Sequence, residues 1–120
     1  MQYLLLICGD ERKLNNDDLP EDQAAARMQA WAKYAEGLAA ANKVRGGERL
    51  RPIASATTLR MHDGKRLISD GPFAETKEQL GGYFVIEAAN LDEAVELASE
   101  MPHLGDGGSV EIRPIWDFRG

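Results

Sequence analysis

Two short apolar runs along the chain predict strands. Residues 3–8 read YLLLIC before a Gly-Asp pair, and residues 83–87 read YFVIE after a Gly-Gly pair. Both runs are too short for helices that stand alone. Neither run alternates apolar with polar residues, as a strand with one solvated face does. We therefore expect both strands to be covered on both faces of their sheet.

An amphipathic helix is predicted within residues 15–43. Asp18 is placed to cap its first turn, with Glu21 three residues further on. Pro20 fits that turn because its missing N–H would have no helical partner there. Apolar residues then recur at steps of three and four and form the face expected to pack on the sheet: Ala24, Met28, Trp31, Ala35 and Leu38.

A second helix is predicted over residues 91–101. Asn90 is a favourable N-cap, Glu93 occupies the capping-box position, and Pro102 stops the helix. Its expected apolar stripe consists of Leu91, Ala94, Val95, Ala98 and Met101.

The region between the two helices predicts a hairpin. A strand with β-branched residues ends at His62, the Asp-Gly pair that follows suits a tight turn, and residues 66–69 return as the second strand. The chain closes with a strand in residues 109–118, where Pro114 indicates a position near a sheet edge. One side of this last strand is expected to carry Val110, Ile112, Pro114, Trp116 and Phe118.

The element order is β-α-β-β-α-β with an added hairpin, the pattern of a ferredoxin-like α+β sandwich. Two helices cover only one face of such an antiparallel sheet. Because YLLLIC and YFVIE favour burial on both faces, the uncovered face is expected to pack against a second copy of the chain. We therefore predict a homodimer.

Composition narrows the class of protein. The chain has 120 residues, which suits a single domain over residues 1–120, and a net charge of −6. Its most basic stretch, KVRGGERLR, is interrupted by glycines and a glutamate, so no nucleic-acid partner is expected. Cys8 is the single cysteine, which agrees with a reducing compartment. The start MQYLLLIC lacks the features of a signal peptide or a membrane span, so a cytoplasmic protein without a membrane partner is expected.

Residues 70–88 read DGPFAETKEQLGGYFVIEA, and this stretch closely resembles the DGPFAETKE family of YCII-related proteins. The resemblance extends nearly from end to end, through YLLLICGDE, GGERL, ATTLR, DGK and VEIRPI. It implies a ferredoxin-like fold that dimerises face to face into an α/β barrel, as in distant relatives such as muconolactone isomerase. It also implies a functional link to extracytoplasmic-function sigma factors, to which some family members are joined.

The resemblance further implies a pocket around an aspartate and a histidine. Asp70 ends a hairpin strand before a Gly-Pro turn, where its carboxylate can face a cleft or accept backbone N–H bonds of its own turn. His103 follows the Pro102 stop and can either move a proton together with Asp70 or make a helix-end contact. His62, beside the hairpin turn, is expected in solvent. Met101 stands where the family often has Cys or His before this proline, so a metal or thiol role there finds no support.

The other charged residues of the motif could instead form ion pairs on the surface. Exposed pairs among the charged residues at 75, 77 and 78 would contribute only about 0.2–1 kcal/mol, so a place at a pocket explains them better. A mononuclear metal site from Glu48, Asp70 and His103 has no specific support, and no cofactor is expected. The residues predicted to bind the ligand are Glu48, Phe73, Glu75 and Lys77.

These observations predict a small homodimer with one pocket per subunit for a small organic molecule. If the protein is an enzyme, an acid–base pair without a cofactor suits proton transfer, as in isomerisation or elimination. Asp70 would then act as the base or orienting group, and His103 would shuttle the proton. The alternative is a non-catalytic ligand-sensing or interaction module linked to sigma-factor regulation.

Overall fold

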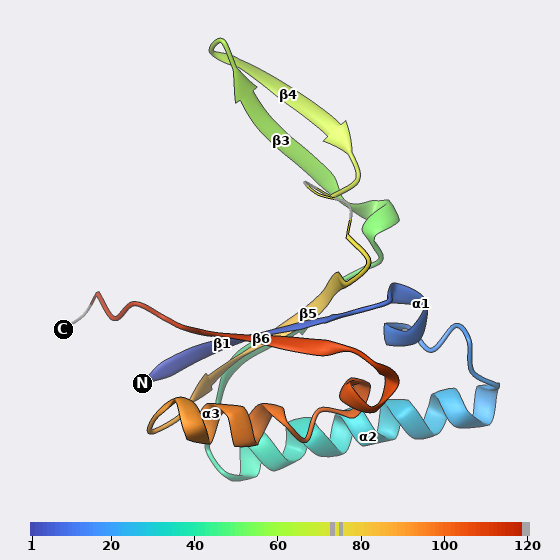
Figure 1. Cartoon of the computed structure of the whole chain (residues 1–120), viewed down its shortest axis with the longest axis vertical. Coiled ribbons are helices and arrows are strands. Elements are labelled where there is room, and N and C mark those ends of the chain that lie inside the picture. Colours follow the sequence, from blue (N-terminus) through green and yellow to red (C-terminus); the bar gives the residue numbers. More distant parts are fainter. Residues whose placement is uncertain (73, 75, 119–120) are drawn as a thin grey trace.

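The computed structural model describes residues 1–72, 74 and 76–118. Its body is a four-stranded antiparallel sheet in the order β2-β5-β1-β6, with helices α2 and α3 on one face (Figure 1). This strand order confirms the predicted ferredoxin-like fold. The elements are β1 (Gln2–Gly9), α1 (Glu11–Leu14), α2 (Glu21–Ala40), β2 (Val44–Arg49), η1 (Ile53–Ser55), β3 (Thr57–His62), β4 (Lys65–Asp70), β5 (Gln79–Glu87), α3 (Leu91–Ala98), η2 (Pro102–Asp106) and β6 (Ser109–Pro114).

The core lies between the helices and one face of the sheet. Because side chains alternate along a strand, Tyr3, Leu5 and Ile7 of β1 all point toward the helices and are buried. Leu5 of β1 and Ile86 of β5 are fully buried. The opposite face, which the helices leave uncovered, carries half-exposed and mostly apolar side chains: Leu4, Leu6, Cys8, Tyr83 and Val85.

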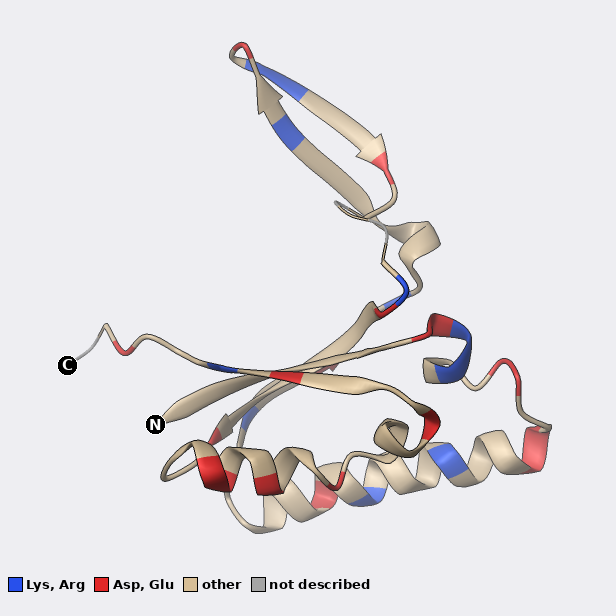
Figure 2. Ribbon diagram, in the orientation of Figure 1, with Lys and Arg blue, Asp and Glu red and all other residues tan. Residues whose placement is uncertain are grey.

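The hairpin of β3 and β4 is a separate two-stranded sheet that projects from the body as an arm (Figure 1). Its turn uses Asp63 (φ 51°) and Gly64 (φ 76°), consecutive left-handed residues of the kind that two-residue hairpin turns favour. The predicted hairpin is therefore confirmed. Both strands of the arm contain basic residues (Figure 2), and neither strand buries a residue. A lone two-stranded hairpin is marginally stable in water, so the arm would gain from contact with another surface.

The start of α2 differs from the prediction, whereas the start of α3 agrees with it. Asp18 does not cap α2; the N-cap position is Pro20, which makes no side-chain capping bond. Asp18 instead lies in a turn closed by a hydrogen bond from the Leu19 N–H to the Asn16 carbonyl oxygen. Asn90 caps α3 as predicted, with its Oδ1 accepting from the backbone N–H at position 93 at 2.9 Å. The helix ends at Ala98, three residues earlier than expected, and a 3₁₀ turn follows.

The last strand is shorter than predicted. It ends at Pro114, and Trp116 and Phe118 are 83% and 89% exposed instead of facing the sheet. The reason is the length of the neighbouring strand: Pro114 lies opposite Tyr3, close to where β1 begins, and the bond from the Ile115 N–H to the Gln2 carbonyl oxygen is the last one available.

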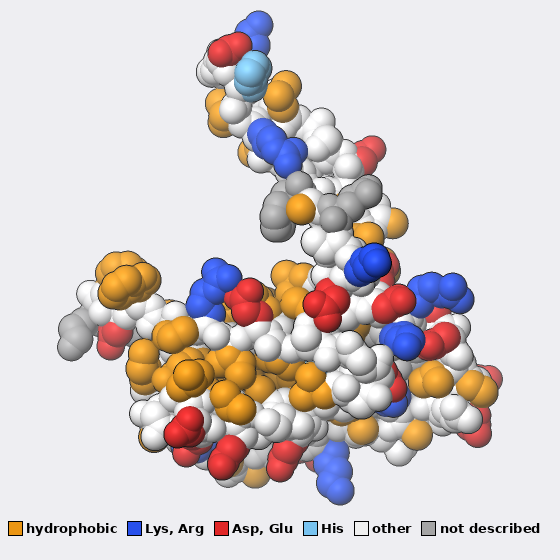
Figure 3. All heavy atoms as spheres, in the orientation of Figure 1, with side chains coloured by type: hydrophobic (Ala, Val, Ile, Leu, Met, Phe, Trp, Pro, Cys, Tyr) orange, Lys and Arg blue, Asp and Glu red, His pale blue; other side chains and the backbone are white. Residues whose placement is uncertain are grey.

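The body of the molecule also exposes apolar side chains. Figure 3 shows hydrophobic side chains gathered between β6 and α3. Leu91 and Val95 of α3 are 52% and 44% exposed. Over the described ranges, no helix combines the length and the apolar character needed to cross a membrane.

Candidate functional site

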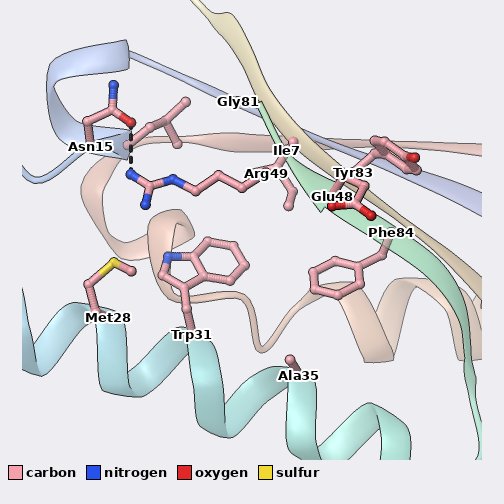
Figure 4. Close-up of a pocket in the computed structure, with 13 residues that line it drawn as sticks. Ile7, Asn15, Met28, Trp31, Ala35, Glu48, Arg49, Gly81, Tyr83 and Phe84 are labelled. Carbon is pink, nitrogen blue, oxygen red and sulfur yellow. Dashed lines mark hydrogen bonds between the residues drawn. The ribbon is translucent and has the colours of Figure 1, made fainter. Parts of the chain in front are cut away.

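A pocket of about 300 Å³ lies between helix α2 and the strands β2 and β5 (Figure 4). Glycines let these strands approach closely at its floor. A Cβ on Gly82 would come 2.8 Å from the Glu48 carbonyl oxygen, and one on Gly47 would lie 2.8 Å from the Phe84 ring. The lining residues are Ile7, Leu14, Asn15, Met28, Trp31, Ala35, Gly47, Glu48, Arg49, Gly81, Gly82, Tyr83 and Phe84.

Aromatic contacts fix two of the pocket walls. The buried Tyr34 ring meets Trp31 edge-on at a centroid distance of 6.0 Å and Phe84 at 5.7 Å. Its hydroxyl donates to the Leu97 carbonyl oxygen at 2.7 Å, which ties α2 to α3. Burial, with a smaller effect from Glu100, raises the pKa of Tyr34 to about 12, so the hydroxyl remains a donor at neutral pH. Trp31 and Phe84 are thereby held facing the space between helix and sheet (Figure 4).

Polar side chains stand at the rim of the pocket. Arg49, the last residue of β2, extends above Trp31 (Figure 4), and its Nη2 donates to Asn15 Oδ1 at 3.1 Å. Asn15 directly follows α1 and forms its C-cap. The neighbouring Glu48 also lines the pocket and is exposed. The site therefore combines an apolar interior with a guanidinium at its opening. Glu48 lies opposite Tyr83, so its side chain is directed to the open face of the sheet.

His103 packs beside the pocket wall in η2. It is 3% exposed, and its ring stacks on Trp31 at a centroid distance of 5.4 Å. Its Nε2 lies 2.7 Å from the Ser109 carbonyl oxygen, which can only accept, so Nε2 carries the proton. Nδ1 is a buried acceptor without a partner among the described residues. Burial lowers the pKa of His103, the Ser109 bond partly opposes this, and Arg27 lowers it further.

Asp70 lies elsewhere in the molecule. It ends β4, opposite Thr57, and is exposed on the arm. His103 contacts Trp31 and Ser109 in the body instead. The described part of one subunit does not bring Asp70 and His103 together. Their acid–base partnership stays a prediction, and another subunit would have to supply the aspartate.

The structure gives separate outcomes for the predicted ligand-binding residues. Glu48 lines the pocket, whereas Lys77 is exposed and does not. Phe73 and Glu75 lie outside the described residues. Across the described residues, no group of three or more His, Cys, Asp or Glu side chains could hold a metal ion.

Sequence reasoning missed three features of the pocket. It assigned Trp31 to a packed helix face, and it gave no role to Arg49 or Phe84. The available signal was the pair of Gly-Gly steps at 46–47 and 81–82, because glycine within strands often marks a place where backbone or ligand approaches closely.

Comparison with known proteins assigns the family. The model of the YCII-related domain matches residues 1–119. The chain belongs to the YCII-related domain family. This match confirms the predicted membership among YCII-related proteins. The matched residues include both the arm and the body of the chain.

One relative of this YCII-related chain and one solved structure are informative. An uncharacterised protein of Rhizobium meliloti (strain 1021) is 38% identical over 118 residues, which cover 96% of this chain and 92% of the relative. Among solved structures, 5-chloro-2-hydroxyhydroquinone dehydrochlorinase from Burkholderia phenoliruptrix, in complex with 2,5-dihydroxybenzoquinone, aligns with a TM-score of 0.54. That alignment covers 98% of this chain and 94% of the other at 18% identity. It shows that the two proteins share a fold.

The buried His103 predicts a pH-dependent stability. Because the pKa of His103 is lower in the folded protein, the unfolded chain binds more protons below about pH 6.5. The stabilisation is therefore present above that pH and is lost as the pH falls toward the folded-state pKa. Urea unfolding at about pH 7.5 and about pH 5.5 should show a loss of unfolding free energy on acidification that His103→Gln reduces.

His62→Gln is the matched control, because His62 is exposed at the arm tip. It should keep the pH dependence of the wild type. Equal pH dependence in all three proteins would contradict the assigned burial of a neutral His103.

Proposed function

We propose that this YCII-related protein is a cytoplasmic homodimer that binds a small organic molecule between α2 and the sheet. The pocket carries the proposal. Its volume of about 300 Å³ lies at the lower end of the range for ligand sites, about 300–1,000 Å³. Apolar walls with a few polar groups at the opening are typical of sites that bury a small molecule and orient it.

If the bound molecule is turned over, we propose cofactor-independent proton transfer, as in isomerisation or elimination. Arg49 at the pocket could stabilise negative charge that develops on the substrate. The candidate base remains Asp70, supplied by a second subunit. The dehydrochlorinase with the same fold is an enzyme, which supports a catalytic role. The alternative, a ligand-sensing module linked to sigma-factor regulation, predicts binding without turnover.

Filling the pocket should weaken ligand binding. Ala35 lines the pocket, so Ala35→Leu places extra carbon atoms in the space that a ligand would occupy. Ala32→Leu makes the same change at an exposed position of the same helix. Small monocyclic acids, phenols and lactones are screened for binding to the wild type by ligand-observed NMR. We expect the compounds that bind to lose at least about tenfold in affinity for Ala35→Leu and to keep their affinity for Ala32→Leu.

Equal binding by Ala35→Leu and Ala32→Leu would contradict the proposed location. Incubation of the bound compounds with wild-type protein, followed by mass spectrometry of the products, then separates the two functions. Chemical conversion assigns an enzyme, and binding without conversion assigns the sensing module.

The proposed dimer interface is the sheet face that the helices leave open. Leu4, Leu6 and Val85 are apolar side chains on this face and only half-buried in one subunit. A small domain gains core by covering such a face with a second copy. The arm offers a further apolar pair, Leu59 opposite Ile68, which are 58% and 63% exposed. In a dimer, the arm of one subunit could bring Asp70 toward the other subunit.

A charge at the centre of this face should separate the subunits. Leu6→Lys would place an ammonium group in the apolar interface, where burial of an unpaired charge is costly. Sedimentation equilibrium at micromolar concentration should give a dimer for the wild type and a monomer for Leu6→Lys. Ala39→Lys, at an exposed position of α2, should remain dimeric. A monomeric wild type would contradict the proposed assembly.

A further inference from the structure

We propose that the ligand of the pocket is a monocyclic aromatic molecule with an anionic group, and that Arg49 binds this group. The inference rests on the proposed function, because it concerns the same pocket, and it adds the chemical class of the ligand.

The walls favour a flat ring. Trp31 and Phe84 face the pocket, and contact with the buried Tyr34 presets both rings before any ligand arrives. Aromatic rings pair favourably in edge-to-face and offset arrangements, so these walls suit an aromatic guest. A cavity of about 300 Å³ has room for one substituted ring and is small for a nucleotide or a long acyl chain.

The charge at the opening favours an anion. The Arg49 guanidinium has five N–H donors, and its bond to Asn15 Oδ1 engages one nitrogen with a neutral partner. Arg27 and Arg113, by contrast, form ion pairs with Asp106 and Glu111. Within the described residues Arg49 forms no such pair. A carboxylate or phenolate entering the pocket would therefore meet a guanidinium with donors left for charge-assisted hydrogen bonds.

The strand register directs the Glu48 carboxylate away from this anion. Glu48 lies opposite Tyr83, and Arg49 lies opposite Gly82. Because side chains alternate along a strand, Glu48 is directed to the sheet face that carries Tyr83, whereas Arg49 is directed to the helix side. A cationic ligand is the competing possibility, which the experiment must address.

Three compounds of nearly equal size test the inference: benzoate, benzyl alcohol and benzylamine. Their dissociation constants for the wild type, Arg49→Gln and Arg45→Gln are measured by NMR titration at low salt. Arg45 is the matched control because it is an exposed arginine of β2 that bonds to the Asn42 and Val44 carbonyl oxygens and does not line the pocket.

We expect benzoate to bind the wild type at least about tenfold more tightly than benzyl alcohol. A difference of this size corresponds to one charge-assisted hydrogen bond. Arg49→Gln should remove this preference while leaving benzyl alcohol unchanged, and Arg45→Gln should keep it. Added salt should weaken only benzoate, because exposed charges are screened.

Different failures have different meanings. If benzyl alcohol or benzylamine binds as well as benzoate, or if Arg49→Gln weakens all three equally, the anionic class is wrong and the pocket still binds ligands. Equal weakening of all three compounds would mean that Arg49 acts by holding β2 against α1 through its hydrogen bond to Asn15, and not by binding the ligand. If none of the three compounds binds, the inference is overturned. If Ala35→Leu and Ala32→Leu also bind ligands equally well, the proposed function is overturned too.

Discussion

The pocket depends on one contact, the packing of the Tyr34 side chain between α2, α3 and the sheet. Its hydroxyl bonds to the Leu97 carbonyl oxygen, and its ring supports both Trp31 and Phe84. On the C-terminal side of Tyr34, α2 closes on the core and buries Leu38. Toward the N-terminus, the helix face lines the pocket through Met28, Trp31 and Ala35, and Met28 is 46% exposed. The packing of Tyr34 thus supports a helix that is partly core and partly open to a ligand.

Much of the fold could be predicted from the sequence because its signals are local. The apolar run of β1, the Asp63-Gly64 turn and the Asn90 cap each act through neighbouring residues, and each was correctly interpreted. The errors arise where a distant segment decides the outcome. Trp116 and Phe118 continue an apolar alternation, yet they extend beyond the end of the neighbouring strand and remain in solvent.

The site was less predictable for the same reason. Helical periodicity places Trp31 on the apolar face of α2, but it does not distinguish a filled core from an open pocket. Arg49 is held by its hydrogen bond to Asn15, the C-cap of α1, a four-residue helix that the sequence pattern did not indicate. Asp70 and His103 were paired through the family resemblance, whereas the projection of the arm separates them within one subunit. Arrangements that join distant segments therefore define this site. Among the predicted ligand-binding residues that the structure describes, Glu48 lines it and Lys77 does not.

The methionines offer the most direct test that a ligand enters between α2 and the sheet. Met28 lines the pocket, Met61 lies on the arm and Met101 is buried in the core. Protein labelled with ¹³C at the methionine methyl groups can be titrated with benzoate and followed by NMR. Binding in the pocket predicts a saturable shift of the Met28 resonance, with Met61 and Met101 nearly unchanged. A Met28 resonance that does not move, or a larger shift at Met61, would contradict the account.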